Sequence, residues 1–204
     1  MKKIKVAVLV SGGGTNLGAL IAAERDGIIK SGEISLVISN KPGVYALERA
    51  KNAGIEALTV TKAECGSQEA FENRLAEELK LRGIELIVLA GFMAILSERF
   101  TSLYKDRIIN VHPSLIPSFC GKGYYGLKVH EAALAYGVKV TGATVHYVNE
   151  IPDGGKIILQ KSVEIEDTDT PEILQRRVME KAEWIILPQA CEMVSKLLLS
   201  KETE

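Results

Sequence analysis

Three polar side chains, Asn110, His112 and Asp153, have the chemistry to catalyse a proton or group transfer. Asn110 and His112 are two residues apart at the end of a predicted strand, so their side chains project to the same face. An amide can donate hydrogen bonds to a carbonyl oxygen while an imidazole exchanges a proton. Asp153 lies in a Pro-Asp-Gly-Gly turn, and a carboxylate near His112 is expected to raise the pKa of the ring above about 6.5.

The remaining histidines have weaker claims to a catalytic role. His130 stands beside Glu131 on a predicted helix, where a hydrogen-bonded or surface ring is the simpler interpretation. His146 is inside a predicted strand, and a structural and a catalytic role both stay open for it. Asp153 by itself also fits a plain turn, because Asp before Gly is common there.

A glycine-rich turn, Ser-Gly-Gly-Gly-Thr-Asn at residues 11–16, follows the first predicted strand. Glycine lets a backbone approach an anion, and the amides at the next helix N-terminus point toward it. Leu17 replaces the third glycine of a dinucleotide site, and the Lys-Ser/Thr of a triphosphate-binding loop is missing. Thr15 and Asn16 add side-chain donors, which favours a phosphomonoester. A tight structural turn is an equally good interpretation of the loop alone.

The elements that must position these residues alternate as in a doubly wound α/β protein. Apolar runs at residues 4–10, 33–39, 86–90 and 107–111 predict strands, and helical patterns stand between them. This alternation predicts a mostly parallel, Rossmann-like sheet with helices on both faces. His112 would then lie at the carboxyl end of a strand, where open α/β sheets bind ligands.

The second half of the chain has a different pattern. Segments 142–148 and 157–165 predict strands paired antiparallel around the turn at Asp153. Thr170 followed by Pro171 predicts the start of a helix toward Leu199, which we expect Pro188 to kink or divide. No repeat or linker interrupts the chain, so we expect one domain over residues 1–204.

Composition excludes several classes of protein. The 204 residues include 25 Lys and Arg against 26 Asp and Glu, a formal net charge of -1, so a general nucleic-acid binder is not expected. The most apolar stretch, 86–96, is too short to cross a membrane, and no signal-peptide pattern opens the chain. Three widely spaced cysteines predict reduced thiols rather than a metal or redox site. We therefore expect a cytoplasmic protein without a metal.

Four blocks of sequence resemble the phosphoribosylglycinamide formyltransferase family. They are Ser-Gly-Gly-Gly-Thr-Asn-Leu at 11–17, Leu-Ala-Gly-Phe-Met at 89–93, Asn-Val-His-Pro-Ser-Leu-Ile-Pro at 110–117, and Thr-Gly-Ala-Thr-Val-His-Tyr-Val at 141–148 with Asp-Gly-Gly at 153–155. Their order and spacing match over nearly the whole chain. The resemblance implies the formyltransferase fold and transfer of the formyl group of 10-formyltetrahydrofolate to the amine of 5-phosphoribosylglycinamide in de novo purine synthesis.

The resemblance also implies roles for individual residues. Asn110, His112 and Asp153 would be catalytic, and the ribonucleotide phosphate would bind Gly14, Thr15, Asn16 and Glu183. The folate would lie against Met93, Ala94, Ile95, Leu96 and Asn110. The N-terminal half, 1–105, would bind phosphate or nucleotide, and the C-terminal half, 106–204, would carry catalysis and folate binding. The expected partners are the two small-molecule substrates, with formyl folate as co-substrate, no nucleic acid or membrane, and a monomer or homodimer.

The chain departs from the family pattern at several positions. Ala94 replaces an arginine common after Phe-Met, and Gln68 replaces a basic residue expected near the phosphate. Cys120 and Lys156 stand where proline is usual. Residues 178–184, around Glu183, are one residue longer than the family pattern.

Three other interpretations remain. Methionyl-tRNA formyltransferase shares the Asn-x-His core but is a longer protein with a C-terminal nucleic-acid-binding domain. We do not expect such a domain here. Formyltetrahydrofolate hydrolase resembles a protein with an added N-terminal regulatory domain, whereas here a strand is predicted from Ile4. A non-catalytic phosphosugar-binding module would explain residues 11–16 but not Asn110, His112 and Asp153.

Overall fold

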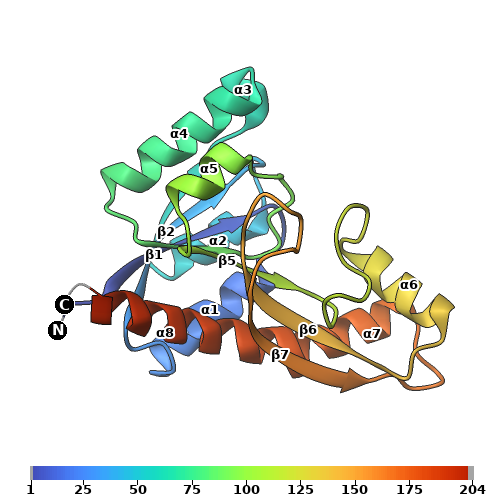
Figure 1. The fold of residues 1–204 in the computed structure, drawn as a ribbon. Helices are drawn as coiled ribbons and strands as arrows, with labels where there is room; N and C mark the ends of the chain where they lie inside the picture. Colours follow the sequence, from blue (N-terminus) through green and yellow to red (C-terminus); the bar gives the residue numbers. More distant parts are fainter. Residues whose placement is uncertain (1, 202–204) are drawn as a thin grey trace.

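A seven-stranded sheet with helices on both faces forms the protein, as a computed structural model describes it for residues 2–201 (Figure 1). The strands are β1 (Ile4–Val10), β2 (Gly32–Ser39), β3 (Glu56–Thr59), β4 (Leu86–Leu89), β5 (Ile108–His112), β6 (Val140–Tyr147) and β7 (Ile157–Glu164). The helices are α1 (Thr15–Arg25), α2 (Tyr45–Asn52), α3 (Lys62–Cys65), α4 (Gln68–Leu81), α5 (Glu98–Leu103), α6 (Leu127–Tyr136), α7 (Pro171–Val178), the π-helix η1 (Met179–Glu183) and α8 (Trp184–Lys201).

The sheet confirms the predicted doubly wound architecture. Its strand order is β3-β2-β1-β4-β5-β6-β7, and the first five of these strands are parallel. Strand β6 runs antiparallel to both β5 and β7, as the hairpin pattern predicts. Strand β3 was not predicted, because it is a four-residue edge strand that is only partly buried.

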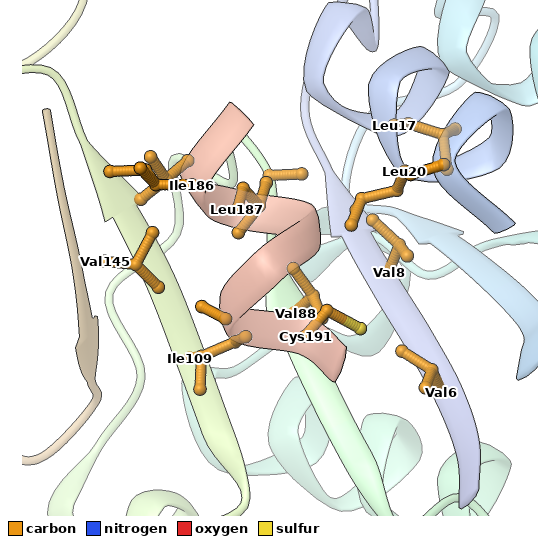
Figure 2. Close-up of a cluster of buried hydrophobic side chains, with 14 of the residues drawn as sticks. Val6, Val8, Leu17, Leu20, Val88, Ile109, Val145, Ile186, Leu187 and Cys191 are labelled. Carbon is orange, nitrogen blue, oxygen red and sulfur yellow. The ribbon is translucent and has the colours of Figure 1, made fainter. Parts of the chain in front are cut away.

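Two apolar clusters cover the two faces of the sheet. The larger one packs α1, α2 and α8 against β1, β4, β5 and β6, and Figure 2 shows Leu187 and Cys191 of α8 lying over these strands. The smaller one packs Phe71 and Leu75 of α4 and Phe100 of α5 on the opposite face. Figure 1 shows α4 and α5 on one side of the sheet and α1 and α8 on the other.

The order in which the chain adds strands to the sheet reverses between β1 and β4. The chain builds outward from β1 through β2 to β3, then returns to place β4 on the other side of β1. The loops after two such neighbouring strands diverge to opposite faces and leave a crevice, the usual ligand site of an open α/β sheet. Here the two loops are the glycine-rich turn after β1 and the segment after β4 that contains residues 90–97.

The C-terminal helical region is interrupted before Pro188 rather than at it. Five residues, Met179–Glu183, form a π-helix between α7 and α8, and Pro188 lies inside α8. A π-helical turn accommodates one extra residue without ending the helix. It therefore explains how the longer segment around Glu183 fits the fold. Within residues 2–201, the helices are either too short or too polar to span a membrane.

Candidate active site

Asn110, His112 and Asp153 come together although they are far apart in the sequence. Asn110 and His112 lie on β5, and Asp153 lies in the connection between β6 and β7. The Nδ1 atom of His112 is 3.4 Å from Oδ2 of Asp153. His112 is 4% exposed, so this contact is shielded from water. The structure thus brings the three predicted residues into one cluster.

His146, whose role the sequence left open, is the fourth member of this cluster. It pairs with Asn110 across the β5–β6 ladder, which brings the two side chains to one face. Its Nδ1 lies 2.8 Å from the Tyr147 carbonyl oxygen, and its Nε2 lies 3.2 Å from Asn110 Nδ2. The same Nε2 lies 3.5 Å from Asp153 Oδ1. His146 therefore orients both Asn110 and Asp153.

A short loop after β5 closes the other side of the cluster. The Nε2–H of His112 donates to the Phe119 carbonyl at 2.9 Å. The Gly121 amide donates to Asp153 Oδ2 at 2.8 Å. Phe119 and Asp153 both have a positive φ, of 48° and 56°, which is uncommon outside glycine. The backbone around Cys120 thus holds the imidazole and the carboxylate in place, a contribution that side-chain motifs do not reveal.

The protonation of His112 differs from the sequence prediction. Burial lowers the pKa of His112 below its usual 6.5, and the attraction of Asp153 only partly offsets this. Burial also opposes ionisation of Asp153, but hydrogen bonding from His146, the nearby His112 and the Gly121 amide outweigh it and lower its pKa. The prediction that Asp153 raises the pKa of His112 above 6.5 is therefore wrong, because the ring lies deeper than the sequence could indicate.

Two adjoining cavities meet at Asn110 and Asp153. One has a volume of about 130 Å³ and extends toward Val148 and Ile151. The other has a volume of about 600 Å³ and extends past His112 toward Tyr124 and Tyr125. Both are lined by the segment after β4, including Ala94 and Ile95, and Leu96 lines the smaller and Met93 the larger cavity. All five residues predicted to contact folate, Asn110 included, therefore border these cavities.

The residues predicted to bind phosphate form a second cluster at the start of α1. Gly14 precedes α1 with φ +70°, and a Cβ there would lie 2.7 Å from the Ala46 Cβ. Asn16 donates through Nδ2 to Glu183 Oε2 at 2.7 Å, and both side chains are buried. Thr15 contacts the Met179 sulfur at 3.8 Å. The π-helix thus brings Glu183 and Met179 to the glycine-rich turn.

Ser11 links the two clusters. Its hydroxyl donates to Asn40 Oδ1 at 2.7 Å and accepts from the Met93 amide at 2.8 Å. The hydrogen bond from Met93 joins the end of β1 to the segment after β4, at the place where the strand order reverses. Within residues 2–201, no group of three His, Cys, Asp or Glu side chains is placed to hold a metal ion.

Comparison with known proteins places this geometry in context. The chain matches the model of the formyl transferase family over residues 4–191. It is 40% identical over 175 residues to phosphoribosylglycinamide formyltransferase of Escherichia coli (strain K12), covering 86% of this chain and 80% of that relative. It is also 44% identical over 193 residues to the trifunctional purine biosynthetic protein adenosine-3 of Gallus gallus, covering 95% of this chain but 18% of that one. The chain thus spans less than a fifth of the length of this larger relative.

Solved structures agree with the sequence matches. The crystal structure of glycinamide ribonucleotide transformylase 1 from Symbiobacterium toebii superimposes with a TM-score of 0.89 at 41% identity, covering 95% of this chain and 88% of that one. Phosphoribosylglycinamide formyltransferase from Bacillus halodurans gives a TM-score of 0.85 at 37% identity, with 95% of each chain covered.

Proposed function

The chain belongs to the formyl transferase family, and from this premise we propose that it transfers the formyl group of 10-formyltetrahydrofolate to the amine of 5-phosphoribosylglycinamide. The products are the N-formyl ribonucleotide and tetrahydrofolate, within purine biosynthesis. One observation carries the proposal: Asn110, His112 and Asp153 converge where two cavities meet. A donor and an acceptor bound in adjoining spaces would react at this junction.

The reaction needs an oxyanion to be stabilised and a proton to be moved. The amine nitrogen attacks the formyl carbon, the bond from that carbon to the folate nitrogen breaks, and one proton passes from the attacking to the leaving nitrogen. Asn110 can donate to the developing oxyanion through its amide, an interaction worth about 3 kcal/mol in comparable sites. Asp153, ionised and beside the cavity, can accept the proton through a water molecule.

His112 enters this scheme as a neutral ring that can carry, in transit, the one proton that passes from the attacking nitrogen to the leaving folate nitrogen. Its Nδ1 faces the Asp153 carboxylate, so a proton gained there would be stabilised immediately. Negative charge developing on the substrate oxygen would add to that stabilisation. Donation from Nε2 to the oxyanion requires the hydrogen bond to Phe119 to be released. The lowered pKa of His112 therefore describes the ring before substrates bind.

The substrates would occupy different loops of the same crevice. The phosphate would bind the turn at Gly14, Thr15 and Asn16, whose backbone amides start α1. Glu183 would serve the ribonucleotide site through Asn16, whose side-chain amide it holds by a hydrogen bond. The folate would lie against residues 93–96 and Asn110, which line the cavities. Both loops lie at the position where open α/β sheets bind ligands, which supports this assignment.

The proposal extends to the organisation of the chain and its setting. Residues 1–204 would act as one domain, with 1–105 supplying the phosphate site and 106–204 the catalytic side chains and part of the folate site. The protein would work in the cytoplasm as a monomer or homodimer, with small molecules rather than nucleic acid as partners. The absence of an excess positive charge supports the last point.

The substitution Asp153→Asn tests the assigned chemistry. An asparagine keeps an oxygen for the Gly121 amide but removes the charge beside His112. We expect kcat for formyl transfer to 5-phosphoribosylglycinamide to fall by about 10²- to 10³-fold. Steady-state kinetics with each substrate, and circular dichroism to verify folding, are the measurements.

The matched control is Asp167→Asn, which changes an exposed carboxylate that pairs with Lys139. It should leave the rate within about twofold of the parent, because surface ion pairs contribute little. Assays with water as the only acceptor separate transfer from hydrolysis. Parental rates in a folded Asp153→Asn protein would refute the catalytic role, and ligand binding without transfer would refute the enzyme activity.

A further inference from the structure

Helix α4 holds the segment after β4 through a buried carboxylate. Glu72 is 1% exposed and accepts from the Ser97 amide at 2.7 Å and from the Ser97 hydroxyl. It also accepts from Gln68 Nε2 at 2.8 Å, and Arg99 lies 4.0 Å away. A buried carboxylate is stable only when it is hydrogen-bonded in this way. Glu72 therefore fixes Ser97, the residue that caps α5.

Gln68 extends this attachment into the middle of the segment. Its Nε2 donates both to Glu72 and to the Ile95 carbonyl, the latter at 3.0 Å. Both donor contacts come from one nitrogen, so the carboxylate orients the amide that holds Ile95. The resemblance assigned this position to a basic residue near the phosphate, but in this chain Gln68 contacts the predicted folate segment instead.

The segment after β4 needs these side-chain hydrogen bonds because it has no regular secondary structure. Residues 90–97 contain no helix or strand. Met93 and Ile95 are 49% and 70% exposed, so burial of these large apolar side chains does not hold them in place. Ala94 and Ile95 nevertheless line both cavities. Leu96 anchors the segment in the smaller apolar cluster, and attachment at Ser11 on one side and at Gln68 and Glu72 on the other holds the exposed residues of this cavity wall.

We propose that Gln68 and Glu72 are positioning residues that set the affinity for the formyl folate donor by holding residues 93–97 in the binding conformation. The inference rests on the proposed function, because it takes this segment as the folate site. Neither residue lines either cavity, so they act through Ile95 and Ser97 rather than by touching the ligand.

The charge of Glu72 is part of this arrangement. Burial opposes ionisation of Glu72, but hydrogen bonds from Ser97 and Gln68 outweigh it and lower its pKa. All the groups that contact it are donors or cations. A glutamine would direct an amide N–H at one of these donors, so Glu72→Gln should loosen both Ser97 and Gln68.

The substitution Gln68→Ala is the primary test, because this side chain is only partly buried and its removal should not prevent folding. We expect KM for 10-formyltetrahydrofolate to rise about five- to tenfold, as for the loss of one hydrogen bond. The KM for 5-phosphoribosylglycinamide should change less than about twofold. Hydrogen exchange of the amides of residues 93–97 should become faster. Glu72→Gln should produce the same pattern more strongly.

Two further variants make the test specific. Gln68→Arg keeps a donor within reach of Ile95, so it should restore KM for the folate to within about twofold of the parent. Glu69→Gln changes an exposed carboxylate on the same helix and should alter neither KM. An unchanged folate KM in Gln68→Ala, an equal rise in both KM values, or an arginine variant as impaired as the alanine variant would each overturn the inference.

Failure of the inference can be distinguished from failure of the proposed function. A parent protein without formyl transfer would refute the function. Calorimetric titration with tetrahydrofolate would then still compare the parent with Gln68→Ala. Weaker binding and faster exchange in the variant would support the positioning role, and equal binding would refute it.

Discussion

At the scale of single residues, the most unusual group is the Glu183 carboxyl. Burial raises its pKa to about 7, and the hydrogen bond from Asn16 offsets this only in part. Asn16 Oδ1 has no hydrogen-bond partner among the described residues, although it is buried. A fold rarely keeps such a pair without a functional reason. The pair is therefore consistent with a ligand site placed at the expense of stability.

The substitution Glu183→Gln should stabilise the protein at high pH. The carboxyl has a pKa of about 7 in the folded chain and about 4.3 when unfolded, so the fold loses stability as pH rises through this interval. A glutamine does not titrate, and its amide can donate to Asn16 Oδ1 if the asparagine amide turns over. We expect the free energy of unfolding at pH 8 to rise by about 3 kcal/mol, measured by urea denaturation.

The comparison across pH checks the sign of this effect. At pH 4 the parent carboxyl is mostly protonated in both states, so the parent and Glu183→Gln should be about equally stable. Affinity for 5-phosphoribosylglycinamide should fall in the variant if Glu183 serves the ligand. A variant that is less stable than the parent at pH 8 would contradict the buried-acid account.

At the scale of elements, the hairpin of β6 and β7 decides where Asp153 lies. Gly142 of β6 pairs with Ser162 of β7, and a Cβ at Gly142 would lie 2.0 Å from the carbonyl oxygen of the neighbouring Lys161. A Cβ at Gly155 would lie 1.6 Å from the Tyr147 carbonyl oxygen. The close approach at both ends of the hairpin thus depends on the absence of side chains.

The substitution Gly142→Ala should force the two strands apart. Because backbone must move to relieve the contact, we expect the free energy of unfolding to fall by about 2–3 kcal/mol, measured by urea denaturation. Ser162→Ala, at the exposed position paired with Gly142 in the ladder, is the control and should stay within about 0.5 kcal/mol of the parent. Equal stabilities for the two variants would show that the hairpin tolerates a wider spacing.

At the scale of the whole molecule, α8 ties the two halves of the chain together. It packs against α1, β1, β2 and β4 from the N-terminal half and against β6 and β7 from the C-terminal half. Its residues Leu187, Cys191 and Val194 are 2% exposed or less, within one continuous apolar cluster. The N-terminal half alone would leave this face of its strands only partly covered, by α1 and α2.

We therefore expect one cooperative unfolding transition. Calorimetry should give equal calorimetric and van't Hoff enthalpies, the signature of a two-state domain. A fragment of residues 1–105 should lack dispersed amide resonances, because α8 no longer covers β1, β2 and β4. Two separate transitions, or a folded fragment, would contradict the single-domain proposal.

Local sequence patterns were enough to predict six of the seven strands, the glycine-rich turn and the candidate catalytic residues. These depend on local pattern: Val and Ile runs buried on both faces, Gly14 before α1, and the two-residue spacing of Asn110 and His112. The four-residue strand β3 was not predicted, because its residues are only partly buried or exposed and form no continuous apolar run.

The order of the strands in the sheet and the depth at which their side chains are buried became known from the three-dimensional structure. The placement of β4 beside β1 brings the two ligand loops together, and the pairing of β6 with β5 brings His146 to Asn110. The pKa of His112 falls because elements distant in sequence exclude water from it. Strand order and burial are non-local properties, since they depend on surface that other parts of the chain cover.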